Sequence, residues 1–339
     1  METQSISIVI EWENVLLSEM ERCCAMLKEL GRQLCEFHPS RELSPDQSDI
    51  PPWVKTPVEV LVAYCSEHVD GSLVNKVLAE SLSSADDCFM VRLLPASLTD
   101  SGYYDLKNFG ARHATGDIIV FLDSDVIPEP GWLKALLSGF ADPAVEVVCG
   151  NTYIGADNTL ARAFALFWFF PVRAQHVSFE PTQGLYANNL AVRRKTFERF
   201  PFPKIEGTSR GSCVGLAAIL HEHDITIYRH TGAKACHPPP NGLRHFLLRA
   251  IAQGRDEFIC AHIRRPRWAG REVWRHIRQF LKDVKGGFVS VFRNARTVHL
   301  SLIEVPAVIF IGVLFYQIRL CAALVTMVFP GYMKSHFRV

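Results

Sequence analysis

The stretch Asp117-Ile-Ile-Val-Phe-Leu-Asp-Ser-Asp125 decides the fold, because a short apolar run ends abruptly on two carboxylates that flank one serine. Residues 118–122 are apolar throughout and rich in β-branched side chains, which is typical of a central strand in a parallel sheet. Asp123 and Asp125 should therefore lie at the carboxyl end of that strand, where open α/β sheets bind their ligands. Carboxylates gathered there suit a hard divalent cation that carries phosphate groups, although Asp and Ser also form ordinary turns.

The composition is that of a chain with a large core. With 339 residues, 48% hydrophobic residues and a formal net charge of +1, the chain is neither disordered nor polybasic. The near-zero charge gives no reason to expect nucleic acid as a partner, because nucleic-acid-binding domains usually carry a basic excess. The ten cysteines are scattered, so they indicate neither a zinc-ligand spacing nor a disulfide framework. Buried free thiols in a reducing compartment fit this pattern better.

Strands and helices alternate along the first half of the chain. Apolar runs predict strands at residues 5–10, 58–64, 89–94, 118–122 and 145–149, with Pro95 closing the third strand. Apolar residues at helical spacing predict helices at 15–34, 73–82 and 104–114, and a polar, Pro-rich linker is expected at 38–57. The alternation predicts an α/β fold with a doubly wound, parallel sheet.

The pattern changes beyond residue 151, where the chain becomes aromatic and less regular. A helix-like aromatic segment at 160–170 is followed by a stretch at 184–194 and a helix at 214–221. We interpret this region as the half that faces an acceptor. Its aromatic side chains either belong to the core or form an interfacial surface that a lipid can approach.

The carboxyl-terminal region is predicted to associate with a membrane. Residues 300–329 are almost wholly apolar and long enough to cross a bilayer of about 30 Å. Because Glu304 and Arg319 are charged, a single span is one option, and a kinked or re-entrant helix pair, permitted by Pro306, is another. The preceding segment interleaves aromatic residues with the basic residues Arg264, Arg265, Arg267, Arg271, Arg275, Arg278, Lys282 and Lys285.

Such a cationic helix with aromatic side chains either lies on the inner membrane surface or is a solvated helix of a soluble domain. We expect the first, and therefore a location at the cell inner membrane. The amino terminus lacks the charged segment, apolar core and cleavage site of a secretory signal. The catalytic part is thus expected to be cytoplasmic.

Several motifs follow one another in a fixed order. After the first strand come Leu106-Lys-Asn-Phe-Gly-Ala-Arg-His-Ala-Thr-Gly-Asp117, the Asp-Ser-Asp sequence, Pro128-Glu-Pro-Gly-Trp132 and Ala233-Lys-Ala-Cys-His237. Over about residues 5–260 this order resembles the membrane-associated, bacterial-type family 2 glycosyltransferases. The resemblance implies a GT-A fold, which binds nucleotide-diphospho-sugars, followed by carboxyl-terminal membrane-associated helices.

It further implies a GT-A domain at 1–260, an interfacial basic segment at 261–298 and a hydrophobic anchor at 299–339. Within the GT-A domain, residues 1–150 would bind the nucleotide sugar and residues 151–260 would face the acceptor.

The resemblance assigns roles around the donor. Asp125 would coordinate Mn²⁺ or Mg²⁺, Asp123 would lie near the ribose or the metal ligands, and His237 would contact the metal or the diphosphate. The metal would stabilise the negative charge that develops on the departing diphosphate. Further donor-binding positions are Lys107, Asn108, Glu67, Asp70 and Arg255.

The region of the nucleotide base departs from the family pattern. The usual Pro-x-x-Asn after the first strand reads Glu11-Trp-Glu-Asn14, and the acidic residue expected after the second strand is displaced. Glu67 or Asp70 is a possible substitute, and both can equally be plain loop residues.

The expected catalytic carboxylates are also replaced. An inverting transferase needs a carboxylate that accepts the proton of the acceptor hydroxyl, and the family supplies it from a Glu-Asp pair that opens a helix. Here Ser212 and Cys213 stand at that point, and a hydroxyl or a largely protonated thiol is a poor base. Glu206 is the first alternative candidate for the base and Asp256 the second.

The sequence therefore predicts a metal-dependent, inverting glycosyltransferase of the hexosyltransferase type. It would move a sugar from a nucleotide diphosphate donor, a UDP-sugar, to a lipid-linked or glycan acceptor delivered by the membrane. The alternative is a catalytically impaired donor-binding scaffold in an envelope polysaccharide assembly complex, which Cys213 favours. Nucleotidyl transfer is a third reading, although the Gly-rich phosphate loop usual after the first strand is absent.

Overall fold

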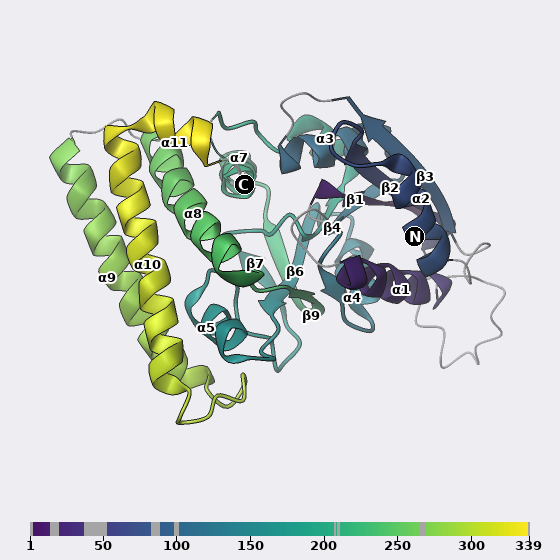
Figure 1. Ribbon diagram of the computed structural model, residues 1–339. Coiled ribbons are helices and arrows are strands. Elements are labelled where there is room, and N and C mark those ends of the chain that lie inside the picture. Colours follow the sequence, from purple (N-terminus) through teal and green to yellow (C-terminus); the bar gives the residue numbers. More distant parts are fainter. Residues whose placement is uncertain are drawn as a thin grey trace. The chain divides into compact units, whose positions relative to one another are not determined.

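A computed structural model gives the fold of the chain (Figure 1). It describes residues 3–13, 20–36, 53–82, 89–97, 102–206, 208, 211–264 and 269–337. The chain divides into two compact units. Unit 1 comprises Met1–Thr152, Ala174–Lys204 and Ser212–His237, and unit 2 comprises Tyr153–Arg173, Ile205–Gly211 and Pro238–Val339.

Unit 1 is built on a sheet whose first four strands run parallel. In spatial order these strands are β3 (Phe89–Ala96), β2 (Val54–Cys65), β1 (Gln4–Glu11) and β4 (Ile118–Asp123). Every residue of β4 is buried, and so are the last six of β1, as expected for apolar strands covered on both faces. The predicted parallel α/β sheet is confirmed for this part of the chain.

Strands of the other half of the sheet pair antiparallel. β8 (Asn189–Arg193) pairs antiparallel with β4, and β6 (Val147–Ile154) pairs antiparallel with β8. The sheet continues through β9 (Ile227–His237) to the short β5 (Ile127–Pro128), and β7 (Phe179–Thr182) also pairs with β9. The strand predicted at 145–149 therefore exists, but β8 separates it from β4.

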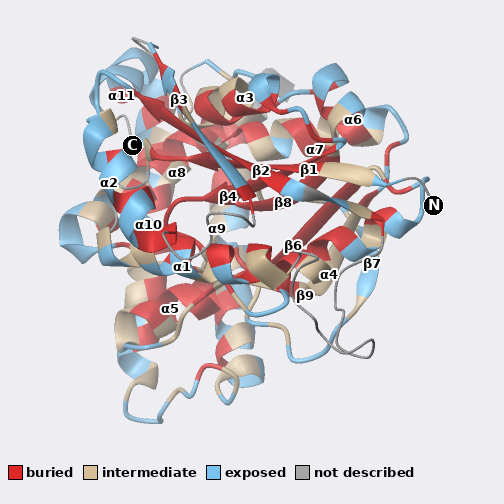
Figure 2. Ribbon diagram, turned by 90° about the vertical axis from the view of Figure 1, so that its right-hand side faces the viewer, coloured by how far each residue is buried: buried red, intermediate tan, exposed pale blue. Residues whose placement is uncertain are grey.

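Helices cover both faces of this sheet. One apolar cluster joins α1 (Met20–Glu36), α2 (Gly71–Leu82) and α4 (Trp132–Ser138) to one face, and another joins α3 (Tyr103–His113), α6 (Arg194–Arg199) and α7 (Ser212–Glu222) to the other. Because side chains alternate along a strand, Ile8 and Ile10 enter the first cluster and Val9 the second. Figure 2 shows buried residues concentrated along these strands.

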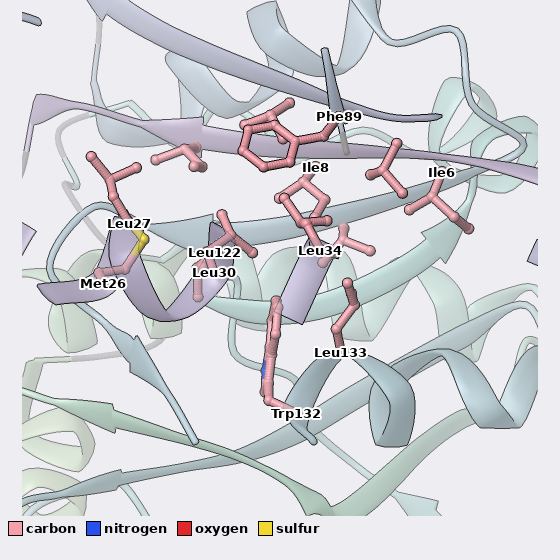
Figure 3. Packing of buried hydrophobic residues seen from close by; sticks show 14 of the residues in the cluster. Ile6, Ile8, Met26, Leu27, Leu30, Leu34, Phe89, Leu122, Trp132 and Leu133 are labelled. Atoms are coloured by element: carbon pink, nitrogen blue, oxygen red, sulfur yellow. The ribbon is translucent and has the colours of Figure 1, made fainter. Parts of the chain in front are cut away.

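The cluster beneath α1 fixes the position of that helix. Met26, Leu27, Leu30 and Leu34 recur at helical spacing and are fully buried. Figure 3 shows them grouped with Ile8 and other strand residues, and with Trp132 and Leu133 at the start of α4. Apolar burial on this scale is the main stabilising contribution to the fold.

The end of β3 and the start of β2 differ from the sequence prediction. Pro95 does not close the third strand, because β3 continues to Ala96 with Pro95 opposite Tyr64. β3 is the last strand in the sheet order, and an edge strand tolerates proline because it lacks a partner on one side. β2 begins at Val54, within the predicted linker, and residues 38–52 of that linker lie outside the described residues.

Unit 2 is helical. Its helices are α5 (Thr159–Phe167), α8 (Gly242–Arg264), α9 (Ala269–Asn294), α10 (Val305–Val328) and α11 (Pro330–His336). α10 packs against α8, α9 and α5. In Figure 1, α8, α9 and α10 run side by side. Phe164 and Phe167 of α5 are buried, and the Phe164 ring contacts Phe246 and Phe315. These two aromatic residues belong to the core of unit 2.

Among the described residues, α10 is the one helix that is long and apolar enough to cross a membrane. It is continuous, and Pro306 lies in its first turn, where the missing N–H breaks no intrahelical hydrogen bond. The alternative of a kinked or re-entrant helix pair is therefore wrong. The Arg319 side chain forms ion pairs with Asp283 of α9 and Glu257 of α8, so the charge within α10 is neutralised inside unit 2.

Candidate active site

A buried ion pair lies at the carboxyl end of β4. Asp123 is the last residue of that strand, and its Oδ1 lies 2.7 Å from Nζ of Lys107 in the second turn of α3. Both side chains are almost completely removed from solvent. A charge-assisted hydrogen bond in such surroundings fixes the orientation of the Asp123 carboxylate.

Tyr103 also binds the Asp123 carboxylate. Its hydroxyl donates a hydrogen bond to Asp123 Oδ2, and its ring lies 4.8 Å from Lys107 Nζ. Desolvation and the adjacent carboxylate raise the pKa of Tyr103 well above its usual value, so the phenol remains a donor. Sequence reasoning missed Tyr103, although Tyr103 and Lys107 are spaced i, i+4 and so share one face of a helix.

A second carboxyl group lies beside Asp123. Glu11 ends β1, is fully buried, and stands opposite Asp123 in the parallel pairing of β1 with β4. Burial and repulsion by Asp123 and Asp125 raise the pKa of Glu11 well above its ordinary value, and the Lys107 charge offsets this only in part. The site therefore gathers three buried carboxyl groups, those of Glu11, Asp123 and Asp125, around one lysine.

Asp125 and the end of β9 are held together by one arginine. Arg22 of α1 donates from Nε to the Asp125 carbonyl and from a terminal nitrogen to the Cys236 carbonyl, both at 2.6 Å. The antiparallel pairing of β5 with β9 places Ile127 opposite Cys236. Buried His237 follows Cys236 directly, so both the ladder and Arg22 hold it next to the Asp125 turn.

The Pro-Gly-Trp sequence fixes β9 from the other side. Gly131 has a φ of 78°, a left-handed conformation that favours glycine, and it introduces α4. The buried Trp132 indole donates to Asn189 Oδ1 at 2.8 Å, and the Asn189 amide donates to the Ala233 carbonyl at 2.9 Å. This relay joins α4, β8 and β9, so the motif positions the strand that ends at His237.

These residues fit a divalent cation. Asp125 supplies a buried carboxylate and His237 an imidazole, a donor set that suits Mn²⁺. The Ser124 hydroxyl is buried between the aspartates and has no hydrogen-bond partner among the described residues. A buried hydroxyl of this kind between two carboxyl groups indicates a polar ligand at the turn.

Other predicted donor residues have structural partners. The Asn108 amide accepts from the Phe202 backbone N–H at 3.1 Å and donates to its carbonyl at 2.9 Å. Asp70 accepts from the Ser72 N–H and hydroxyl at the start of α2, and Glu67 accepts from Ser97 at 3.3 Å. Their contacts with a donor stay predictions. Asn14 of the predicted base region lies outside the described residues.

The sequence of this site matches a known family. Residues 78–200, which include Lys107, both aspartates and the Pro-Gly-Trp sequence, match the family described as Glycosyl transferase family 2. Over this segment the chain is similar to glycosyl transferase family 2.

Curated relatives match shorter stretches. A pre-mycofactocin glycosyltransferase of Mycobacterium tuberculosis is 32% identical over 97 residues, which are 26% of this chain and 21% of that protein. A probable N-acetylgalactosaminyltransferase 9 of Caenorhabditis elegans is 43% identical over 60 residues, which are 18% of this chain and 10% of that protein. The chain thus spans about a fifth or less of the length of these relatives.

The fold has a solved counterpart. A mannosyltransferase from Pyrobaculum calidifontis, solved in complex with GDP-Man and Mn²⁺, superposes with a TM-score of 0.57 at 15% identity. The alignment covers 98% of this chain and 89% of that one. The GT-A-type α/β fold expected from the resemblance to family 2 is confirmed.

Cys213 occupies the position where family 2 was expected to supply an acid. Its Sγ lies 3.0 Å from the Tyr104 hydroxyl and accepts from the Ala187 N–H at 3.3 Å. Desolvation raises the pKa of the Cys213 thiol, so the group is protonated at neutral pH. Neither Cys213 nor Ser212 can replace a carboxylate base.

The predicted base candidates belong to unit 2. Glu206 is exposed in a turn, whereas Asp256 is buried on α8. Asp256 accepts a hydrogen bond from Arg255 Nε at 2.8 Å and forms an ion pair with a terminal Arg255 nitrogen at 2.7 Å. Arg255 also donates to the Phe337 carbonyl. The catalytic roles of Glu206 and Asp256, and the contact of Arg255 with a donor, stay predictions.

Proposed function

We propose that the chain is a metal-dependent glycosyltransferase that transfers a sugar from a UDP-sugar donor to a lipid-linked or membrane-delivered acceptor. The observation that supports this most directly is the buried Asp123-Ser-Asp125 turn at the carboxyl end of β4, within the segment of family 2. Carboxyl groups gathered at the end of a strand suit a divalent cation, and a nucleotide diphosphate brings one.

Each residue of the site has a distinct task in this proposal. Asp125 and His237 would hold Mn²⁺ or Mg²⁺, while Lys107 and Tyr103 orient Asp123. A divalent ion held there would supply positive charge to the departing diphosphate. The bond from the anomeric carbon to phosphate oxygen breaks, a bond from that carbon to the acceptor oxygen forms, and the hydroxyl proton passes to a protein carboxylate.

Glu206 is the carboxylate that we propose for this proton. It is exposed and therefore accessible to an acceptor, whereas Asp256 is already bound by Arg255. Glu206→Gln keeps the size of the side chain and removes its basicity, so turnover should fall by at least about a hundredfold. Glu222→Gln, an exposed change at the end of α7, is the matched control. Unchanged turnover of Glu206→Gln would exclude this base.

The primary test is release of nucleotide diphosphate from a panel of UDP-, GDP- and dTDP-sugars. Detergent-purified full-length protein is assayed with an extracted lipid fraction, in Mn²⁺ or in chelator. We expect Mn²⁺-dependent release from a UDP-sugar, abolished by Asp125→Asn. The control is Asp224→Asn, which alters an exposed residue with a φ of 58° that asparagine also adopts. Equal release with and without metal would contradict the proposal.

The protonated Cys213 thiol favours a second candidate function, a donor-binding scaffold without catalysis. Such a scaffold would bind UDP in a Mn²⁺-dependent way and lose binding in Asp125→Asn, yet release nothing from any donor. Calorimetry with UDP and Mn²⁺, run beside the release assay, separates the two functions.

We further propose that unit 2 attaches the chain to the cytoplasmic face of the inner membrane, with residues 1–260 as the catalytic domain. Large apolar side chains are exposed just before α10, with Leu302 90% and Ile303 91% exposed, and within its second turn, with Phe310 66% exposed. α9 presents basic and apolar groups on its exposed side, namely Arg271, Trp274, Arg278, Leu281, Lys282, Lys285, Phe288 and Phe292. Anionic lipid attracts such a combination.

Exposed residues give a sharper test of attachment than truncation, because α10 is also part of the core of unit 2. Changing Leu302, Ile303 and Phe310 together to serine should reduce co-flotation with anionic vesicles while circular dichroism stays unchanged. Changing the exposed neutral polar positions Gln317, Asn241 and Gln279 to serine is the matched control. Undiminished flotation of the first variant would refute the role of the α10 surface.

A further inference from the structure

A thiol, an imidazole and a carboxylate lie close together in unit 1, at the carboxyl ends of β1 and β2. Glu13 lies just after β1, Cys65 ends β2, and His68 lies in the turn that follows. One ligand atom from each residue lies within 4.8 Å of the others. Among the residues that the structure describes, this is the one group of three such side chains.

The backbone brings these three residues together. Glu11 stands opposite Ala63 in the parallel pairing of β1 with β2, and the Trp12 N–H extends that pairing by donating to the Ala63 carbonyl at 2.9 Å. Continued by two residues, the register sets Glu13 beside Cys65. The arrangement thus follows from strand pairing, although 52 residues separate the two positions in sequence.

A helical turn then returns His68 to Cys65. The Cys65 carbonyl accepts from the His68 N–H at 3.1 Å and from the Val69 N–H at 2.9 Å. In a turn of this kind, side chains three positions apart lie on the same side. The sequence Cys65-Ser-Glu-His68 therefore has the spacing of a metal-ligand pair, which an inspection of cysteine spacings alone did not reveal.

The geometry suits zinc. His68 Nδ1 lies 3.4 Å from Glu13 Oε1. Two ligands bound to a tetrahedral Zn²⁺ at about 2.0–2.1 Å are separated by about 3.3 Å, so these atoms already stand at the required spacing. A soft sulfur with an imidazole selects zinc over Mg²⁺ or Mn²⁺, unlike the oxygen-rich turn at Asp125.

The partial exposure of His68 and Glu13 provides an entry path for a metal ion. Cys65 is buried, the Glu13 side chain is 20% exposed and the His68 side chain is 48% exposed. An ion can therefore approach from solvent beside His68 and reach the thiol with the movement of one exposed side chain.

We propose that Glu13, Cys65 and His68 form a zinc site with three protein ligands and a water molecule in the fourth position. Binding displaces the thiol proton to solvent, since the thiolate is the ligand. The ion joins the end of β1 to the turn after β2 and stabilises the folded chain, because the unfolded chain does not present the three ligands together. This site is separate from the metal site of the proposed function.

Cobalt binding tests the proposal without any need for activity. Full-length protein with Asp125→Ala, which removes the oxygen-rich site, is stripped with chelator and titrated with Co²⁺. We expect one equivalent of Co²⁺ to give a thiolate-to-cobalt charge-transfer band and the visible bands of tetrahedral cobalt, both lost on addition of Zn²⁺. Absence of the charge-transfer band at saturating Co²⁺ would overturn the site.

Single variants assign the ligands. Cys65→Ser and His68→Ala should each weaken Co²⁺ binding at least tenfold, with loss of the charge-transfer band in Cys65→Ser. His68 is exposed enough for its variant to fold even if a change at buried Cys65 is not tolerated. His176→Ala, an exposed histidine elsewhere in unit 1, is the matched control and should bind like the parent. A band that survives His68→Ala unweakened would refute the assignment.

Discussion

Lys107 and Asp123 form an ion pair in which both side chains are buried, with 2.7 Å between Nζ and Oδ1. The pair joins α3, which carries Lys107, to the end of β4, which carries Asp123. Because buried ions are costly unless paired, each residue depends on the other.

Replacement of the lysine should therefore destabilise unit 1 strongly. Lys107→Met leaves the Asp123 carboxylate buried without its counter-ion, and we expect a loss of about 3–5 kcal/mol in the free energy of unfolding. Urea denaturation followed by tryptophan fluorescence measures it. Lys195→Met, at an exposed position, should change stability by less than about 0.5 kcal/mol. A loss of similar size in both variants would show that the pair contributes little.

Glu11 should make the metal-free protein less stable as the pH rises. Its folded pKa is raised above the ordinary value of 4.5, so the folded state holds the proton more tightly than the unfolded state. The stabilisation is complete below 4.5 and is lost as pH rises through the folded pKa.

Glu11→Gln removes this dependence, because the amide is neutral at every pH. The variant should gain stability over the parent as the pH rises above 4.5 and through the folded pKa of Glu11, measured as urea midpoints in chelator. Parallel curves for variant and parent would mean that Glu11 ionises normally.

The Cys213 thiol should react slowly with alkylating reagents at neutral pH. Desolvation raises its pKa in the folded protein, and the thiolate is the reactive form. The pH profile of iodoacetamide labelling, followed by mass spectrometry, should shift to higher pH than the profile of the same residue in urea. A shift of the labelling profile to lower pH would contradict the raised pKa of the Cys213 thiol.

Trp132 should stabilise the fold through its indole nitrogen as well as its packing. Trp132→Phe leaves Asn189 Oδ1 buried without the donor that lies 2.8 Å away, and we expect a cost of about 1–3 kcal/mol. Trp274→Phe, at a largely exposed position, is the control for the loss of a tryptophan. Equal effects of the two changes on the unfolding midpoint would contradict a role for the hydrogen bond.

The parallel part of the fold could be predicted because local patterns determine it. The uninterrupted apolar run before Asp123 required a strand buried on both faces, and the structure has it. The insertion of β8 between β4 and β6 could not be predicted in this way, since it depends on pairing with a segment about seventy residues distant. Likewise, β9 contains few apolar residues in its Ile227–His237 sequence and gave no strand signal.

The site was predictable in its aspartates and less so in their partners. Asp123 and Asp125 can be recognised in the sequence because they follow an apolar run. Tyr103 reaches Asp123 only because it lies one helical turn before Lys107. Arg22 and Glu11 reach the same site from other elements. Their contributions depend on tertiary packing, which the spacing along one segment does not contain.

Pro95, in the outermost strand β3, also influences how copies of the protein meet. A strand docking onto that margin would find no N–H at Pro95 and would have to accommodate the charged Arg92, which is bound to Glu59. Such features discourage one sheet from growing into the next. Concentrated preparations should accordingly resist fibre-like aggregation from this side, and any assembly of the protein would have to use a different surface.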